Sequence, residues 1–175
     1  VDFYDDGSAR WACLWDVSNP PSPTNLALPE TFSYEGVEYP VTQIQFTQWD
    51  KRRNVTALTL PDTLTAVNHS SFYKFPALKE ITIPGSIKNF DGSFQNMSDL
   101  LTITFDEGVE EISSNSMVYG CDVLAEINLP TSLKRITAPA AFASAPALKS
   151  IHLPEGLVIA EGSLLSDCTA LTHVE

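Results

Sequence analysis

Cysteine, basic side chains and long apolar runs are all scarce in this sequence. Only 3 of its 175 residues are Cys, so a framework of disulfides is not expected. No apolar run approaches the roughly 18 residues that a membrane-spanning helix needs, so membrane insertion is not expected. Lys and Arg number 10 against 22 Asp and Glu, and the net charge of −12 disfavours nucleic acids and anionic membrane surfaces as partners.

The sequence also lacks the motifs of common catalytic and cofactor sites. It contains no glycine-rich phosphate loop, no His-Glu-x-x-His and no paired Cys-x-x-Cys. His69 is followed by Ser70 and Ser71, but neighbours in sequence do not by themselves form a nucleophile and its base. We therefore expect no enzymatic activity, no cofactor and no metal site.

What the sequence does contain is a repeat. The pattern Leu-x-x-Ile-x-Leu-Pro occupies residues 148–154, and the given sequence stops inside a further copy at 171–175. Related copies lie at 55–61, 78–84, 100–106 and 124–130, with Asp106 in the position that is otherwise Pro. Successive Pro positions are 22 to 24 residues apart. This spacing falls in the roughly 20–29 residue range of leucine-rich repeats and is too short for a pair of helices.

Each copy of the repeat predicts a short β-strand. Ile127 and Leu129 lie two residues apart and share one face, whereas Glu126 and Asn128 point to the other face. Pro130 then ends the strand because it has no N–H to donate. Stacked copies can bury apolar residues that one copy alone cannot. Strands of successive copies would pair in parallel about 4.8 Å apart through right-handed connections.

Between the strands, the apolar residues occupy two recurring positions. The first position is usually aromatic and contains Phe72, Phe94, Met117 and Phe142. The second position contains Phe75, Met97, Cys121, Ala145 and Cys168. Cys121 and Cys168 are two copies apart, hence roughly 10 Å from each other, which is too far for a disulfide. Both are predicted to be small buried core residues.

These residues resemble the BspA-like leucine-rich repeat family. The string Leu-Pro-x-x-Leu-x-x-Ile is followed by Phe-x-x-Cys-x-x-Leu-x-x-Ile-x-Leu-Pro, and the resemblance covers roughly residues 26–175. It implies a leucine-rich-repeat fold without catalytic residues. It also implies a surface protein like those of gut and oral anaerobes and some protists, whose known roles are adhesion or binding of host proteins.

We therefore predict an α/β-type right-handed leucine-rich-repeat solenoid. It would have one curved parallel β-sheet, short 3-10 or irregular turns opposite, and an antiparallel β cap at the N-terminus. Residues 1–25 would form the cap and a connector, because residues 1–4 and 10–15 alternate as in a hairpin. Residues 26–175 would form about six units, the last incomplete. Within the first unit, residues 32–41 predict a second hairpin that turns at Glu35 and Gly36.

The outward side chains of the predicted sheet are the candidate binding residues, because solenoids commonly bind partners on such a face. One column contains Thr59, Thr82, Thr104, Asn128, His152 and Glu175. The neighbouring column contains Ala57, Glu80, Thr102, Glu126, Ser150 and His173. The alternative interpretation is a solvated ladder of residues that favour strands and contribute only solubility. The two His side chains should lie near Glu175, but two His and one Glu on a flat surface are weak geometry for a metal.

The sequence favours the function of a non-catalytic interaction module that is displayed on the cell surface or secreted. It would bind a protein or glycan partner on the sheet face, in the manner of an adhesin. The alternative is a structural spacer or display domain of a larger surface protein. An extracellular or cell-surface location is expected, although the sequence begins at Val1 without a signal segment. An uncapped apolar C-terminal end would also favour weak self-association.

Overall fold

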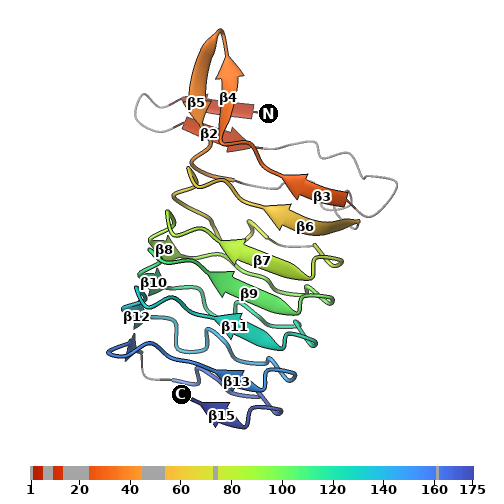
Figure 1. The fold of residues 1–175 in the computed structure, drawn as a ribbon, viewed down its shortest axis with the longest axis vertical. Helices are drawn as coiled ribbons and strands as arrows, with labels where there is room; N and C mark the ends of the chain where they lie inside the picture. Colours follow the sequence, from red (N-terminus) through yellow and green to blue (C-terminus); the bar gives the residue numbers. More distant parts are fainter. Residues whose placement is uncertain (1, 6–9, 14–23, 45–53, 73–74, 161) are drawn as a thin grey trace.

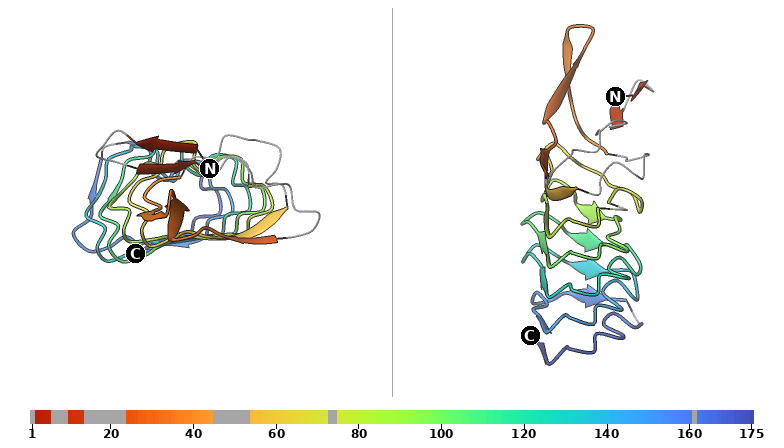
Figure 2. Two further views of the ribbon diagram at one scale, coloured as in Figure 1. Left: turned by 90° about the horizontal axis from the view of Figure 1, so that it is seen from above. Right: turned by 90° about the vertical axis from the view of Figure 1, so that its right-hand side faces the viewer.

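The computed structural model describes residues 2–5, 10–13, 24–44, 54–72, 75–160 and 162–175. These residues form a stack of turns along the length of the molecule, with two hairpins at the N-terminal end (Figure 1). Viewed along the stack, the turns lie over one another around a shared interior (Figure 2). No helix occurs in the described residues, and so none that could cross a membrane.

A parallel sheet, here called the long sheet, follows one side of the stack (Figure 1). Its five strands, in spatial order from the C-terminal side, are β11 (Glu126–Asn128), β9 (Thr102–Phe105), β7 (Glu80–Ile83), β6 (Val55–Thr59) and β3 (Thr24–Ala27). The parallel pair β13 (Ser150–Ile151) and β15 (His173–Val174) continues the same side of the stack. Parallel pairing between successive copies is therefore confirmed.

Strand formation follows from the alternation in the sequence. In β7 the side chains of Ile81 and Ile83 are buried, whereas those of Glu80 and Thr82 are exposed. Pro84 then ends the strand because it cannot donate a ladder hydrogen bond. In the next turn Asp106 takes this position, and its N–H donates to the carbonyl of Ile83 at 2.9 Å. The chain path therefore does not depend on Pro at this position.

A second parallel sheet, the short sheet, was not anticipated from the sequence, which predicted one sheet and irregular turns. Its four strands of two residues are β14 (Val158–Ile159), β12 (Arg135–Ile136), β10 (Glu111–Ile112) and β8 (Asn89–Phe90), in that spatial order. They form in the segment that follows each Pro position, and the second residue is buried in β8, β10 and β12, whereas both residues of β14 are exposed. The connections predicted as 3-10 or irregular turns contain no 3-10 turn in the described residues, so the fold is α/β-type only in its repeat topology.

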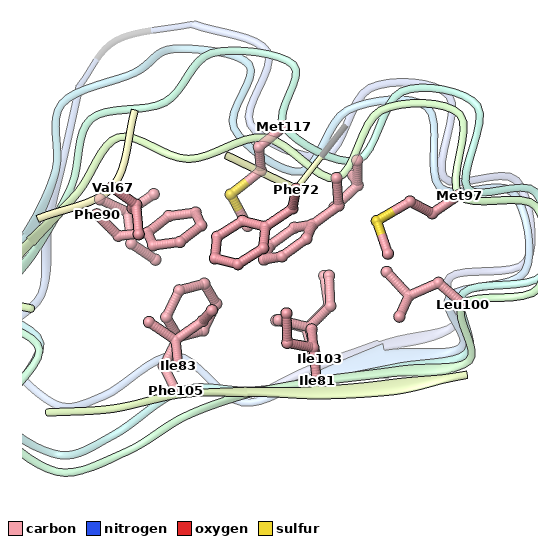
Figure 3. Close-up of a cluster of buried hydrophobic side chains, with 14 of the residues drawn as sticks. Val67, Phe72, Ile81, Ile83, Phe90, Met97, Leu100, Ile103, Phe105 and Met117 are labelled. Carbon is pink, nitrogen blue, oxygen red and sulfur yellow. The ribbon is translucent and has the colours of Figure 1, made fainter. Parts of the chain in front are cut away.

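The core lies inside the turns, with the long sheet along one side of it (Figure 3). Ile81 pairs with Ile103 on the long sheet, and the ring of Phe72 lies across the core from them (Figure 3). The ring centroids of Phe72 and Phe94 are 5.3 Å apart. The predicted aromatic position is fully buried except in the last turn, where Leu164 is only partly buried. Burying one Ile or Phe side chain contributes about 1.5–3 kcal/mol, so the repeated positions supply most of the stabilisation.

Two antiparallel hairpins occupy the N-terminal end, as predicted. β1 (Asp2–Asp5) pairs with β2 (Arg10–Cys13), and β4 (Thr31–Tyr34) pairs with β5 (Val37–Pro40). Glu35 and Gly36 have φ angles of 51° and 79°, the left-handed pair that a two-residue type I′ turn requires. The β4–β5 hairpin projects beyond the stack (Figure 2). Trp15, Phe46, Trp49 and the basic run at 50–53 lie outside the described residues, as does most of the connector.

Candidate interaction face

The outward side chains of the long sheet form the two predicted columns. Thr104 is paired with Thr82 on one side and with Asn128 on the other. Thr102 is likewise paired with Glu80 and Glu126. The register continues at the C-terminal end, where Ser150 pairs with His173. Thr59 follows Leu58, which pairs with Ile81, and His152 follows Ile151, which pairs with Val174.

Most side chains in these columns are free of protein partners. Ala57, Thr102 and Thr104 are half-buried and the other candidate residues are exposed. Asn128 Nδ2 donates to Thr104 Oγ1 at 3.3 Å. Within the described residues, no hydrogen bond or ion pair involves the side chains of Thr59, Glu80, Thr82, Thr102, Glu126 or Ser150. The middle of this face therefore offers hydroxyl and carboxylate groups that remain available to a ligand.

The outer face of the short sheet differs because its polar side chains pair with one another between turns. Lys134 binds Glu110, and Arg135 binds Glu111. The hydrogen bond from Lys134 holds the pKa of the Glu110 carboxyl below its usual value. Ser113 Oγ and Asn89 Oδ1 are 2.9 Å apart. The polar groups of this face thus contribute to holding successive turns together.

The outer face of the long sheet is here called the long face, and that of the short sheet the short face. At its C-terminal end the long face brings together the two His side chains and Glu175, as predicted. His173 Nε2 lies 2.8 Å from Glu175 Oε1, and His152 Nδ1 lies 3.4 Å from Glu175 Oε2. The hydrogen bond from His173, and then that from His152, holds the pKa of Glu175 below its usual value. No group of three or more His, Cys, Asp or Glu in the described residues is placed to hold a metal ion.

A shallow hollow, here called the Pro84 hollow, lies where strands β6 and β7 end. Its volume is about 260 Å³, and it is continuous with the outward threonine column. Its lining residues are Leu58, Thr59, Leu60, Asp62, Thr82, Pro84 and Asp106. The two carboxylates come from the turns on either side of Pro84. Sequence reasoning placed Thr59 and Thr82 on the face but missed Asp62 and Asp106, because its strand pattern stopped at the Pro position.

Two other carboxylates at the same corner are structural. Glu107 accepts hydrogen bonds from the backbone N–H groups of Thr131 and Ser132 in the next turn, at 2.8 and 3.1 Å. The bond from the Thr131 amide lowers the pKa of Glu107. Glu30 accepts in the same way from the amides of Asp62 and Thr63. These residues satisfy backbone donors that would otherwise lack a partner.

The remaining candidates from the sequence have structural explanations. Asn68 Oδ1 accepts from the N–H of Ser70, so this segment next to His69 forms a local polar turn. Cys121 and Cys168 are free and buried, as predicted, and burial raises the pKa of the Cys121 thiol to about 11. Neither segment supplies an activated nucleophile within the described residues.

The last turn exposes apolar surface. Val158 is 67% exposed and Val174 is 48% exposed, although both belong to strands. Both strands lie at the edges of their sheets. Weak self-association through this end stays a prediction.

Comparison with known proteins identifies the repeat. The profile of the family described as BspA type leucine rich repeat region matches residues 30–140 and 115–175, in six copies. The chain belongs to this family. The BspA-type repeats account for every turn of the long sheet from β6 onward. No curated protein matches the chain.

Two solved structures show the same fold. One is a leucine-rich cell surface protein from Faecalibacterium prausnitzii A2-165, with 22% identity and a TM-score of 0.57 over 99% of this chain and 54% of the other. The second is a leucine-rich repeat protein from Eubacterium ventriosum, with 21% identity and a TM-score of 0.50 over 76% of this chain and 41% of the other. This BspA-type chain therefore spans about half the length of the solved structures it matches.

Proposed function

We propose that this chain is a non-catalytic interaction module, displayed on a bacterial cell surface or secreted, that binds a protein or glycan partner on the long sheet. The similar Faecalibacterium protein is described as a cell surface protein, which supports this location. Leucine-rich repeats usually act by binding rather than by catalysis, which supports the type of function.

The observation that carries the proposal is the contrast between the two outer faces. On the short sheet, charged side chains pair between turns, as Lys134 does with Glu110. On the long sheet, Glu80 and Glu126 have no such partner in the described part of the chain. Polar groups that contribute nothing to the stack remain free to bind a ligand without disturbing the fold.

The test is a pull-down from bacterial-community or host extracts with a variant of the long face. The double substitution Thr82→Lys and Thr104→Lys adds two bulky cations to the outward column and should leave folding nearly intact. The control, Tyr119→Lys with Val123→Lys, adds the same charge at two exposed residues in the turns that precede β11. A partner lost only with the threonine variant supports the proposal. A partner retained by it contradicts the proposed face, and the absence of any partner favours the spacer function.

A further inference from the structure

The Pro84 hollow contains two carboxylates that the fold does not use. Among the four acidic side chains of this corner, Glu30 and Glu107 bind backbone amides of the following turn. Asp62 and Asp106 are exposed, and their carboxylates make no hydrogen bond or ion pair in the described residues. The backbone N–H of each is satisfied, so neither side chain is needed to complete the turn.

Asp106 stands out because it replaces the Pro of the neighbouring copies. The Pro position ends each strand, and Pro61, Pro84, Pro130 and Pro154 occupy it elsewhere. The N–H of Asp106 keeps the chain in place through its bond to Ile83. Asp106 lines the hollow together with Thr82 and Pro84. This position therefore departs from the repeat at the point where the face is hollowed.

The lining indicates a ligand with an aliphatic stem and a cationic head. Leu60 and Pro84 provide apolar walls, the hydroxyls of Thr59 and Thr82 provide hydrogen-bond partners, and the two carboxylates provide negative charge. Lys and Arg side chains combine an apolar stem with a charged donor group in this way. A volume of about 260 Å³ suits one such side chain better than a folded element.

The surrounding charges favour a basic partner as well. Of the two lysines of the same turn, Lys79 precedes β7, and Lys88 lies beside this corner, where its Nζ donates to the carbonyls of Gly85 and Gly108 at 3.0 Å. Lys88 is thus held by backbone carbonyls, and it does not pair with Asp62 or Asp106 in the described residues. Glu80, on the same strand as Thr82, adds negative charge to the outward face. Among the described residues, no aromatic ring on which a sugar could stack lines the hollow, so a basic peptide fits it better than a neutral glycan. The chain's net charge of −12 would also speed the approach of a cationic segment.

We propose that the Pro84 hollow binds a lysine or arginine side chain from an extended basic segment of a protein partner, with that segment lying along the outward threonine column. This inference rests on the proposed function, because it assigns the class of partner to the same face.

The direct test measures binding of a fluorescent peptide of alternating lysine and threonine by anisotropy, beside a peptide in which glutamine replaces each lysine. The double variant Asp62→Asn with Asp106→Asn removes both free carboxylates. The control variant Asp99→Asn with Asp122→Asn removes two exposed carboxylates from the turns that precede β9 and β11. Both variants have the same net charge, so the comparison separates a local site from a general attraction of opposite charges.

We expect the hollow variant to bind the lysine peptide about tenfold more weakly than the wild type, and the control variant to bind it within about twofold. The glutamine peptide should not bind. Equal weakening in both variants, or undiminished binding by the hollow variant, would overturn the inference. Amide chemical shifts of the wild-type protein provide a check that needs no variant. Shifts clustered at Thr59, Asp62, Thr82 and Asp106 support the site, and shifts confined to another region contradict it.

A second arm separates this inference from the proposed function. Both double variants are used in the pull-down beside Thr82→Lys with Thr104→Lys. A partner lost with the threonine variant but retained by the hollow variant would support binding on the long face and overturn the basic-segment site. A partner lost with both, and retained by Asp99→Asn with Asp122→Asn, supports both conclusions.

Discussion

The long and short sheets arise from one repeat and share one core, yet their outer faces have different compositions. The short face carries ion pairs between turns, such as that of Arg135 with Glu111. The side chain of Glu111 in this pair is mostly shielded from solvent. The long face carries hydroxyls and carboxylates that mostly lack partners in the described part of the chain. The comparison indicates that the repeat fixes what points inward, while each outer face can serve a different purpose. Side chains of one face hold the turns together, and those of the other remain available for binding.

The largest effect should come from placing a charge in the shared core. Ile127→Asp puts an unpaired carboxylate at a site that is 4% exposed and should destabilise the protein by at least about 4 kcal/mol. Asn128→Asp, one residue further along the same strand, faces outward and should remain folded. Thermal melts followed by circular dichroism would distinguish the two variants. If both melted alike, the assigned inward and outward faces would be wrong.

The next effect concerns the corner that joins the two sheets after β7. A Cβ added at Gly85 would lie 1.8 Å from the carbonyl oxygen of Glu107, so backbone would have to move. Gly85→Ala should therefore cost about 3 kcal/mol. At Gly156, where a Cβ meets nothing within 4 Å, the same substitution should cost only about 1 kcal/mol through its φ of 77°. Urea unfolding of both variants would test this order, and an equal loss would contradict the close approach at Gly85.

A smaller effect should separate the two faces directly. Glu111→Gln weakens the pair with Arg135 and should lower the free energy of unfolding by about 1 kcal/mol. Glu126→Gln, on the long face, removes a carboxylate without a partner in the described residues and should leave stability nearly unchanged. Urea midpoints at low salt provide the measurement. A larger loss in Glu126→Gln would mean that the long face also stabilises the stack.

The smallest effect should appear in the pH dependence of stability. Lys134 lowers the pKa of Glu110 in the folded state, so this group stabilises the protein above its unfolded pKa. That contribution is lost as the pH falls through the folded pKa. Glu110→Gln should therefore reduce the loss of stability between about pH 6 and about pH 3. Glu80→Gln is the matched variant on the long face, and an identical slope in both variants would count against the ion pair.

Much of the fold can be predicted from the sequence because the same pattern of apolar and polar residues occurs in several successive copies of the repeat. Alternation around Ile127 predicts the strands, and stacking predicts that Thr82 pairs with Thr104, as the structure has it. The short sheet was missed because segments such as Arg135–Ile136 contain only two residues, too few for alternation to be recognised. They become strands because the stack brings them side by side, which is a property of the assembled turns.

The candidate face was predictable in position but not in detail. The register of the strands alone decides which residues belong to each outward column, so Glu80 and Glu126 could be assigned to their column from the sequence. The roles of Asp62 and Asp106 depend on which carboxylates bind backbone amides, and this cannot be read from residue type. Glu107 and Asp106 are adjacent and both acidic, yet only Glu107 binds the amides of the next turn.

The two buried thiols allow local opening of the turns to be measured by chemical modification. Cys121 Sγ donates to the carbonyl of Phe94, and Cys168 Sγ, two copies further along the same column, donates to that of Phe142. Burial raises both pKa values, so a thiol reagent can react only when a turn opens. With Cys13 replaced by serine, these are the remaining sulfhydryl groups. The ratio of their alkylation rates would report how steeply local opening declines from the C-terminal turn toward the interior.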